Sequence, residues 1–366
     1  MRVIVVGTGA AGAAAAAELA RRGHDVTVLE RFGRGHLHGS SHGATRVFRV
    51  AYREQPYTRW AGATIPLWRE LEERSGEVLL EQNGQIDHGF PGALAEIAAN
   101  LDAGGWHYTR LTASEATERW PGMRFDGDVL FSGDGGRVFA DRALATLLRL
   151  AEEDGADLHF DEPALAIARD GTGVVVATDR GHYGADMVVV AAGAWVSSLE
   201  GWSDIDISLP PLTATQQYPV HFPIRPGFDF PSWVNHIDSH ADDHRFNYGA
   251  YGLESPGEGL KVGMDSSELI EDLGSRTLDV PASALAAAAE YAERWLPGVD
   301  TSIGAGVSCL FTMTKDSHFI LDRQGPVIVA SPCSGHGFKF TPMLGRILAD
   351  LAEDRDHGVA EWRLPA

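Results

Sequence analysis

Three glycines near the start of the chain have the spacing of a turn that binds phosphate. Gly7, Gly9 and Gly12 follow the apolar segment 2–6, which predicts a buried parallel strand. The first glycine permits a tight turn, the second lets backbone amides approach a pyrophosphate, and the third lets the next helix pack closely on the strand. Glu30 ends the next apolar segment and is placed to accept hydrogen bonds from ribose hydroxyls. The pattern predicts a dinucleotide site.

The acid at the end of this pattern narrows the choice of dinucleotide. A carboxylate at Glu30 argues against a 2′-phosphate and hence against NADP. Arg31, directly after it, is also expected at the cofactor, and its positive charge weakens that argument. The glycine pattern alone does not separate FAD from NAD.

Lysine is scarce in this chain, so Lys261 and Lys339 are candidate functional residues. The 30 basic residues include only Lys261, Lys315 and Lys339. Lys339 stands between Phe338 and Phe340, so a partly buried ammonium there needs an anion, which a substrate would supply. Lys315 is expected to be a surface charge.

Cysteine is scarce as well. Cys309 and Cys333 are too few for the disulfide framework of a small secreted protein. A thiol becomes a nucleophile when it is deprotonated, which basic neighbours favour. A single buried cysteine is more commonly inert, so the residue type alone leaves both roles open.

The glycine-rich segment 32–46 contains three histidines, His36, His38 and His42. Such a loop lets the backbone approach a ligand closely. The histidines lack the firm frame and the acidic or thiol partners of a metal site, so we predict no metal there.

A second set of histidines is spaced by four: His236, His240 and His244. On a helix they would share one face. The Asn, Asp and Ser residues between them favour a turn, so the sequence predicts a hairpin of strands 232–237 and 245–251.

Amphipathic patterns place the elements that must position these side chains. They predict helices over 13–22, 57–75, 142–154, 285–296 and 343–353. The apolar strand 187–192 runs into Gly193, where the backbone can approach a cofactor without a side chain in the way. Nucleotide-type elements occur at both ends and in the middle of the chain, so two interleaved domains are expected.

Size and charge exclude several classes of protein. A chain of 366 residues suits two domains. The net charge of −21 makes nucleic acid an unsuitable partner, because phosphate binding needs a basic face. The Ala-rich segment after the glycine turn contains Glu18, which argues against a signal peptide or a membrane span. The expected protein is soluble and cytoplasmic.

Three blocks of sequence resemble those of the monomeric sarcosine oxidase and N-methyltryptophan oxidase family of FAD-dependent amine oxidases. They are GSSHGATRVFR at 39–49, SCLFTMT with DSHFILD at 308–322, and SGHGFKF at 334–340. Their order and spacing agree along nearly the whole chain. The resemblance implies oxidation of a secondary amine of the amino-acid type by molecular oxygen, with release of hydrogen peroxide, in a monomeric enzyme.

The resemblance also implies a fold of the α/β (α+β) class. In it, a Rossmann-type FAD-binding domain is interleaved with a mixed-sheet substrate domain, as in the glutathione reductase-like and D-amino acid oxidase-like flavoproteins. The boundaries it suggests are 1–80, 138–208 and 316–366 for FAD, and 81–137 and 209–315 for the substrate.

In this family the flavin is carried on a cysteine sulfur, and the matching residue is Cys309, giving an 8α-S-cysteinyl FAD. The resemblance places His42 and Arg46 near the flavin ring, where they would help this attachment. It also implies that five further residues of the matching blocks bind the cofactor: Ser40, Thr45, Gly335, Gly337 and Phe338.

The resemblance further assigns three cationic residues. Arg49 and Lys339 match the pair that grips the substrate carboxylate, for which a guanidinium and an ammonium are suited, and Lys339 also lies at the cofactor. Lys261 matches the lysine that activates oxygen, where a fixed positive charge stabilises the anion that forms.

Tyr248 and Tyr251 compete for the family's active-site tyrosine. They are three residues apart in a predicted strand and therefore face opposite sides; the Asn-Tyr-Gly context favours Tyr248. Asp265 and Phe311 depart from the family pattern, which has a histidine near the substrate amine and a tyrosine. These departures argue against sarcosine itself and for a substrate with a further cationic or hydroxyl group.

Two other functions fit the same residues less well. A dehydrogenase that passes electrons to another carrier would not need Lys261. A flavin-binding redox protein without catalysis would not need Lys261, Arg49 or Lys339. The sequence therefore predicts a flavin oxidase of N-methyl or other secondary amino acids, cyclic ones included.

Overall fold

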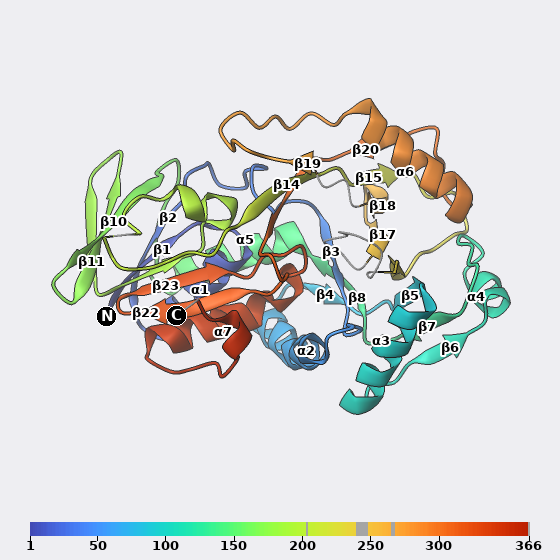
Figure 1. The fold of residues 1–366 in the computed structure, drawn as a ribbon, viewed down its shortest axis with the longest axis horizontal. Coiled ribbons are helices and arrows are strands. Elements are labelled where there is room, and N and C mark those ends of the chain that lie inside the picture. Colours follow the sequence, from blue (N-terminus) through green and yellow to red (C-terminus); the bar gives the residue numbers. More distant parts are fainter. Residues whose placement is uncertain (203, 239–247, 265–267, 365–366) are drawn as a thin grey trace.

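A six-stranded sheet forms one end of the molecule and an eight-stranded sheet forms the other (Figure 1). The structure is a computed structural model. It describes residues 1–202, 204–238, 248–264 and 268–364.

The six-stranded sheet carries the glycine turn. Its strand order is β22-β23-β13-β1-β2-β9, and all neighbours are parallel except β22 and β23. The strands are β1 (Arg2–Val6), β2 (Asp25–Leu29), β9 (Asp157–His159), β13 (Met187–Val190), β22 (Ile320–Gln324) and β23 (Val327–Ser331). The central strands β1 and β13 are runs of Val, Ile and Met buried on both faces, as expected of a covered parallel sheet.

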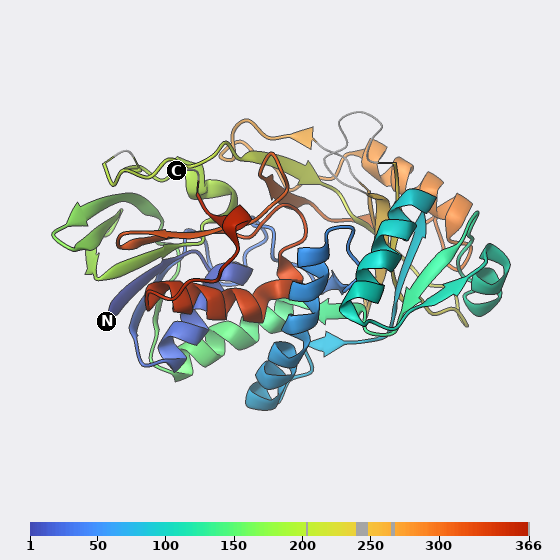
Figure 2. The ribbon, with the colours of Figure 1, turned by 60° about the horizontal axis from the view of Figure 1, so that its bottom comes forward.

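Helices cover one face of this sheet (Figure 2). They are α1 (Ala10–Arg21), α5 (Ala140–Glu153) and α7 (Thr341–Ala352), with α2 (Gln55–Ser75) beside them. The small side chains of α1 let α7 come close: a Cβ at Gly345 would lie 2.6 Å from the Ala14 carbonyl oxygen. The opposite face is covered by the antiparallel sheet β10 (Ala164–Asp170), β11 (Gly173–Thr178) and β12 (His182–Ala185).

The eight-stranded sheet has the order β20-β15-β18-β17-β16-β5-β7-β6. Its neighbours are antiparallel except β5 and β16. The strands are β5 (Gln85–Gly89), β6 (Thr109–Leu111), β7 (Val129–Ser132), β15 (Val220–Phe222), β16 (Ser232–His236), β17 (Tyr248–Ser255), β18 (Gly259–Met264) and β20 (Ala305–Gly306). The helices at this end are α3 (Pro91–Gly104), α4 (Ala113–Arg119) and α6 (Ala282–Trp295).

Two small sheets lie between the ends. One pairs β3 (Thr45–Phe48) and β4 (Leu80–Glu81) with β8 (Gly136–Phe139), and the other pairs β14 (Thr213–Gln217) with β19 (Glu268–Leu269) and β21 (Cys309–Met313). Three short 3-10 helices complete the set: η1 (Gly193–Ser198), η2 (Phe338–Phe340) and η3 (Ala360–Trp362). These connecting elements carry many of the predicted site residues.

The architecture confirms the predicted fold class, because a parallel nucleotide-type sheet and a mixed sheet occur in one chain. The parallel sheet takes its strands from the beginning, middle and end of the sequence. The exact domain boundaries stay a prediction. No helix in the described part of the chain is both long and apolar enough to cross a membrane.

The predicted hairpin is present as the antiparallel pair β16 and β17, although β17 runs on to Ser255. His236 is the last residue of β16; His240 and His244 lie outside the described residues. Within those residues no group of His, Cys, Asp and Glu has the geometry of a metal site.

Candidate active site

A cavity of about 200 Å³ extends from the N-terminus of α1 to the inner face of the eight-stranded sheet. Thirteen of the predicted site residues line it: Gly9, Ser40, His42, Thr45, Arg46, Arg49, Gly193, Lys261, Cys309, Gly335, Gly337, Phe338 and Lys339. The fold thus brings together residues from distant parts of the sequence. Of the remaining predictions, Gly7, Gly12, Glu30 and Arg31 do not line the cavity; Asp265 and the side chain of Tyr248 lie outside the described part of the chain.

The glycine turn forms one end of the cavity. Gly7 has φ +100°, and a Cβ at Gly12 would lie 1.9 Å from the Gly7 carbonyl oxygen. These two glycines therefore let α1 start directly against the strand. At Gly9 a Cβ would meet only the Ser41 hydroxyl, at 3.3 Å, so this position leaves room in front of the first amides of α1. The Ala10 amide donates a hydrogen bond to Ser41 Oγ at 3.0 Å.

Glu30 is buried behind the turn. Its carboxylate accepts hydrogen bonds from the backbone amide and the hydroxyl of Thr8, both at 2.8 Å, and from the Phe32 amide at 3.0 Å. Burial raises the pKa of Glu30, but hydrogen bonds from His36 and the two amides outweigh it and leave the pKa below its usual value. Glu30 is therefore an ionised acceptor. Arg31 beside it is half-buried.

Cys309 begins β21 on the wall of the cavity and is buried. Its Sγ lies 3.9 Å from the Ser40 carbonyl oxygen. The charges of Lys261 and Arg276 interact with the thiol. Two basic side chains therefore lie near a sulfur on the cavity wall.

Arg46 is fixed by backbone carbonyls. Its guanidinium donates to the carbonyl oxygens of Ser40 at 2.8 Å, His42 at 2.6 Å and Thr45 at 2.9 Å. It also lies 5.7 Å from the centre of the Phe338 ring. Burial, followed by the charge of Arg46, lowers the pKa of His42 to about 4, so His42 is neutral at pH 7.

Lys261, in β18, is buried. Its Nζ donates a hydrogen bond to the Thr45 carbonyl oxygen at 3.0 Å. Burial, and then the neighbouring charge of Arg46, lowers the pKa of Lys261 to about 7. The ammonium is thus close to its titration point near neutral pH.

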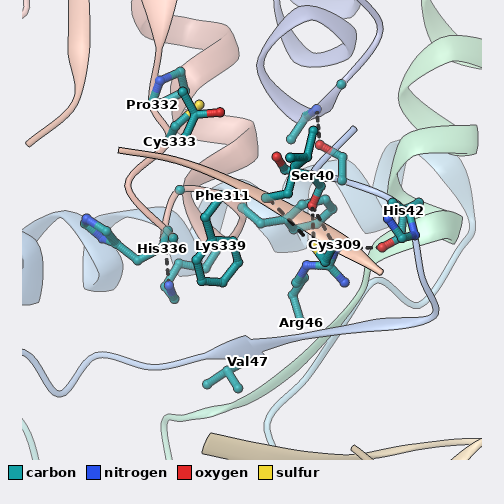
Figure 3. Close-up of a pocket in the computed structure, with 18 of the residues that line it drawn as sticks. Ser40, His42, Arg46, Val47, Cys309, Phe311, Pro332, Cys333, His336 and Lys339 are labelled. Atoms are coloured by element: carbon teal, nitrogen blue, oxygen red, sulfur yellow. Dashed lines mark hydrogen bonds between the residues drawn. The ribbon is translucent and has the colours of Figure 1, made fainter. Parts of the chain in front are cut away.

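Lys339 and Arg49 meet around Tyr52. The Lys339 Nζ lies 5.5 Å and the Arg49 guanidinium 4.3 Å from the centre of the Tyr52 ring. Lys339 also donates to the His336 carbonyl oxygen at 2.7 Å, and Figure 3 shows Lys339 beside His336. Burial, and then the charge of Arg49, lowers the pKa of Lys339 well below its usual value. An anion bound here would reverse that shift.

The four cationic groups of the cavity are not neutralised by acids. Within the described residues, the lining contains no Asp or Glu, and none of Arg46, Arg49, Lys261 and Lys339 forms an ion pair. Buried charges without partners are costly. The site is therefore built to receive anionic groups.

Tyr251 lines the cavity from β17, and Phe311 lines it from β21. The pairing of β16 with β17 shifts by one residue at Gly249, and the side chain of Tyr248 lies outside the described part of the chain. Tyr251 is therefore a candidate for the active-site tyrosine, and the choice of Tyr248 from the sequence context stays a prediction.

Several lining or neighbouring residues escaped the sequence analysis. His221 and Cys333 line the cavity, and neither was predicted as a site residue. Arg276 donates to Gln216, to the His38 carbonyl oxygen and to Ser308, each at 2.8 Å. No local motif marks His221 or Arg276, since each reaches the site through strand pairing or a long loop.

A family model described as FAD dependent oxidoreductase matches residues 2–351 of the chain. The chain belongs to this family. It is 32% identical to the monomeric sarcosine oxidase of Streptomyces avermitilis, over 96% of this chain and 93% of that one. It is 30% identical to the N-methyl-L-tryptophan oxidase of Salmonella agona, over 96% and 94%. The suspected family is thereby confirmed.

Solved structures agree with this membership of the FAD-dependent oxidoreductases. NikD, described as an unusual amino acid oxidase essential for nikkomycin biosynthesis, has a TM-score of 0.87 and 29% identity, covering 99% of this chain and 96% of that chain. The glycine oxidase of Geobacillus kaustophilus has a TM-score of 0.80 and 25% identity, with coverage of 100% and 98%. The chain is a sarcosine oxidase-like oxidoreductase.

The residues of this oxidoreductase fit FAD. Gly9 leaves space at the start of α1, where amides and the helix dipole favour a pyrophosphate. Glu30 offers an ionised acceptor behind the turn. The cavity continues from there to Cys309 and to the cationic side chains of Arg46, Arg49, Lys261 and Lys339, so the part of FAD beyond the pyrophosphate would lie along this wall.

Proposed function

We propose that this enzyme oxidises an N-methyl or other secondary amino acid, cyclic ones included, with molecular oxygen. The products are an imine, or the demethylated amino acid after hydrolysis, and hydrogen peroxide. The observation that carries the proposal is the pair Arg49 and Lys339, two cations without acidic partners among the described residues at one end of the cofactor cavity. A substrate carboxylate would supply their missing charge.

The substrate carboxylate would also restore the charge of Lys339. Burial and Arg49 lower the pKa of this ammonium, and a bound carboxylate raises it again. Arg49 can hold the carboxylate with two parallel hydrogen bonds while Lys339 adds a second charge. With the carboxylate fixed, the amino group and its neighbouring C–H bond are directed toward the rest of the cavity, in which Tyr251 and Phe311 stand.

Bound FAD accepts the two electrons released when the C–N bond of the amine becomes a double bond. We propose that Lys261 serves the oxygen reaction that follows, because it is the buried ammonium nearest the Thr45–Arg46 side of the cavity. Its charge would stabilise the anion formed as O2 takes up electrons. His42, Arg46 and Tyr251 are proposed to shape the same part of the site.

We further propose that FAD is attached covalently through Cys309. The support is the position of the thiol on the cavity wall and its basic neighbours Lys261 and Arg276. Acid-precipitated protein should stay yellow, and Cys309→Ser should release its flavin on denaturation. The matched control is Cys333→Ser, which removes the other thiol of the cavity and should keep the flavin attached. Flavin that washes out of denatured wild-type protein would refute the linkage.

The decisive experiment for the function is a panel of secondary amino acids set against the corresponding amines without a carboxylate, with peroxide as the readout. The amino acids should turn over faster. Faster turnover of the plain amines would show that Arg49 and Lys339 do not bind substrate, and reduction of the flavin without peroxide would show a dehydrogenase. A monomer in the cytoplasm is the proposed state of the protein; gel filtration and cell fractionation test it.

A further inference from the structure

A buried histidine stands directly beside Lys261. His221 in β15 and Lys261 in β18 are register partners in an antiparallel pair, which places their side chains on the same face and within about 4.5–5.5 Å at Cβ. Both line the cavity. The His221 Nε2 is buried and makes no hydrogen bond to the described residues.

The same histidine is close to an acid that reaches solvent. Glu258 lies in the turn between β17 and β18, and its Oε2 is 3.6 Å from His221 Nε2. The His221 side chain is 6% exposed and that of Glu258 is 41% exposed. This separation is just beyond hydrogen-bond distance. Glu258, His221 and Lys261 thus form a series from the surface to the cavity.

The charges around this series favour passage of a proton toward Lys261. Burial, then the charges of Lys261 and Arg46, lowers the pKa of His221 to about 3, so the resting imidazole is neutral. When Lys261 gives up its proton, one of these unfavourable charges disappears and His221 becomes a better proton acceptor. Glu258 in turn raises the pKa of Lys261, which helps the lysine to regain its proton.

Other titratable groups face Lys261 from neighbouring elements. Arg46 on β3 lowers the pKa of the lysine, whereas Cys309 on β21 and Asp141 on α5 raise it. Asp141 accepts a hydrogen bond from the Gly43 amide at 2.7 Å. Neither Cys309 nor Asp141 lies between Lys261 and solvent in a series like that of His221 and Glu258.

We propose that Glu258 and His221 form a path that returns protons from solvent to Lys261 during the reaction with oxygen. The proposal rests on the proposed oxidase function. Reduction of O2 to H2O2 takes two electrons and two protons; the electrons and one proton come from the oxidised amine by way of reduced FAD, and Lys261 supplies the other proton. The Lys261 N–H bond breaks as an O–H bond forms, and His221 then protonates the lysine while Glu258 protonates His221 from the outer side. His221 and Glu258 are positioning residues, since they act through Lys261.

The first test reads the lysine itself and needs no turnover. In holoprotein with 13C-labelled lysine, only three Cε signals are expected, because the chain has three lysines. Glu258→Gln should lower the titration midpoint of Lys261, and the matched control Glu254→Gln, whose carboxylate neighbours Arg137 at 3.7 Å, should leave it in place. An unchanged midpoint in Glu258→Gln would overturn the path.

The second test follows reoxidation of the dithionite-reduced holoenzyme by O2 in a rapid-mixing instrument. His221→Ala should slow reoxidation by roughly 10- to 100-fold, at or below the lower end of the 10²–10⁴ typical of a direct acid–base group, and added imidazole should restore it. Glu258→Gln should slow it by a smaller factor, because water can still reach His221. The loss should grow with pH above 7, where most Lys261 is deprotonated and must gain a proton before it can give one up.

The outcomes separate the path from the oxidase function. Normal reoxidation of His221→Ala, or slow reoxidation that imidazole does not restore, would reject the path. Because dithionite reduces the flavin, these results do not depend on the amine. Failure of every amine to reduce the wild-type flavin would reject the proposed substrate class and leave the path intact.

Discussion

The two ends of the cavity hold their ligand groups in opposite ways. At the glycine turn, binding depends on backbone that carries almost no side chains, and the one acid, Glu30, is fully engaged by hydrogen bonds. At the other end, the cavity wall carries the long cationic side chains of Arg46, Arg49, Lys261 and Lys339, which have no acidic partner in the described part of the chain. The charged group at the first end already has its hydrogen-bond partners within the protein, whereas the cations at the second end lack an opposite charge.

This difference teaches where substitutions should act. Changes at the turn alter the close approach of helix and strand, so they should affect folding and cofactor retention. Changes at the cationic end remove charge that meets a substrate, so they should affect rates and affinities while the fold persists. Four measurements test this division, from the largest effect to the smallest.

The sharpest contrast is expected from Lys261→Met. Removing a pre-placed charge from a site where an anion forms costs on the order of 10²–10³ in rate. Reoxidation of the reduced flavin by O2 should slow by that factor, and reduction by the amine should change far less. An equal loss in both half-reactions would break the assignment of Lys261 to oxygen.

At the substrate, Arg49→Ala should weaken binding while the protein stays folded. A hydrogen bond to a charged group contributes about 1.5–3 kcal/mol, so the Kd of a carboxylate mimic such as a thioether acetate should rise roughly tenfold to more than a hundredfold. Arg53→Ala is the matched control, because Arg53 pairs with Glu96 at 2.6 Å outside the cavity. Equal effects of the two variants on the flavin spectrum would assign Arg49 to structure.

At the turn, Gly12→Ala should lower the Tm, whereas Gly9→Ala should lower the affinity for FAD. The new Cβ at Gly12 would lie 1.9 Å from the Gly7 carbonyl oxygen, so the helix must move, at a cost of about 1–3 kcal/mol and a lower Tm. The Cβ at Gly9 meets only the Ser41 hydroxyl at 3.3 Å, so Gly9→Ala should keep its Tm and lose FAD affinity. Thermal unfolding and FAD titration of the Cys309→Ser background separate the two; a drop in Tm from Gly9→Ala alone would contradict the comparison.

The smallest effect concerns pH. The pKa of Lys261 is lowered to about 7, so its charge is present below pH 7 and is lost as the pH rises through that value. The rate constant for reoxidation should therefore fall by roughly threefold between pH 6.5 and 7.5. Lys261→Arg keeps its charge throughout this range and should show no such fall. A flat profile for the wild type would mean that the lysine does not titrate near neutrality.

The glycine end of the cavity was predictable from the sequence because it is formed by residues close together in the chain. A strand, a turn, a helix and an acid lie within about 30 consecutive residues. Gly7 and Gly12 have steric reasons that the structure shows, and the role of Gly9 toward a pyrophosphate stays a prediction. The fold class and the family followed from this pattern together with the three matching blocks, and both are confirmed.

The cationic end was only partly predictable, since it depends on pairing between distant strands. His221 reaches the cavity because β15 pairs with β18, and no local sequence pattern predicts that the two strands pair. The Asn-Tyr-Gly context favoured Tyr248 over Tyr251, and the structure describes only the side chain of Tyr251, which lines the cavity. The lack of acidic partners for the cations at this end can be seen only in the folded structure, where all residues that line the cavity are known.

The strand order of the six-stranded sheet has a consequence for the stage of synthesis at which the chain can bind FAD. β13 gains its second parallel neighbour only from β23, and the segment 335–339 that lines the cavity follows directly after it. During synthesis the eight-stranded sheet therefore leaves the ribosome before the nucleotide sheet is complete. The sheet that begins with β1, α1 and β2 lacks β23 until the last part of the chain has been synthesised. We therefore expect FAD to bind late in synthesis, and a ribosome-stalled chain ending before residue 320 should be unable to retain the flavin.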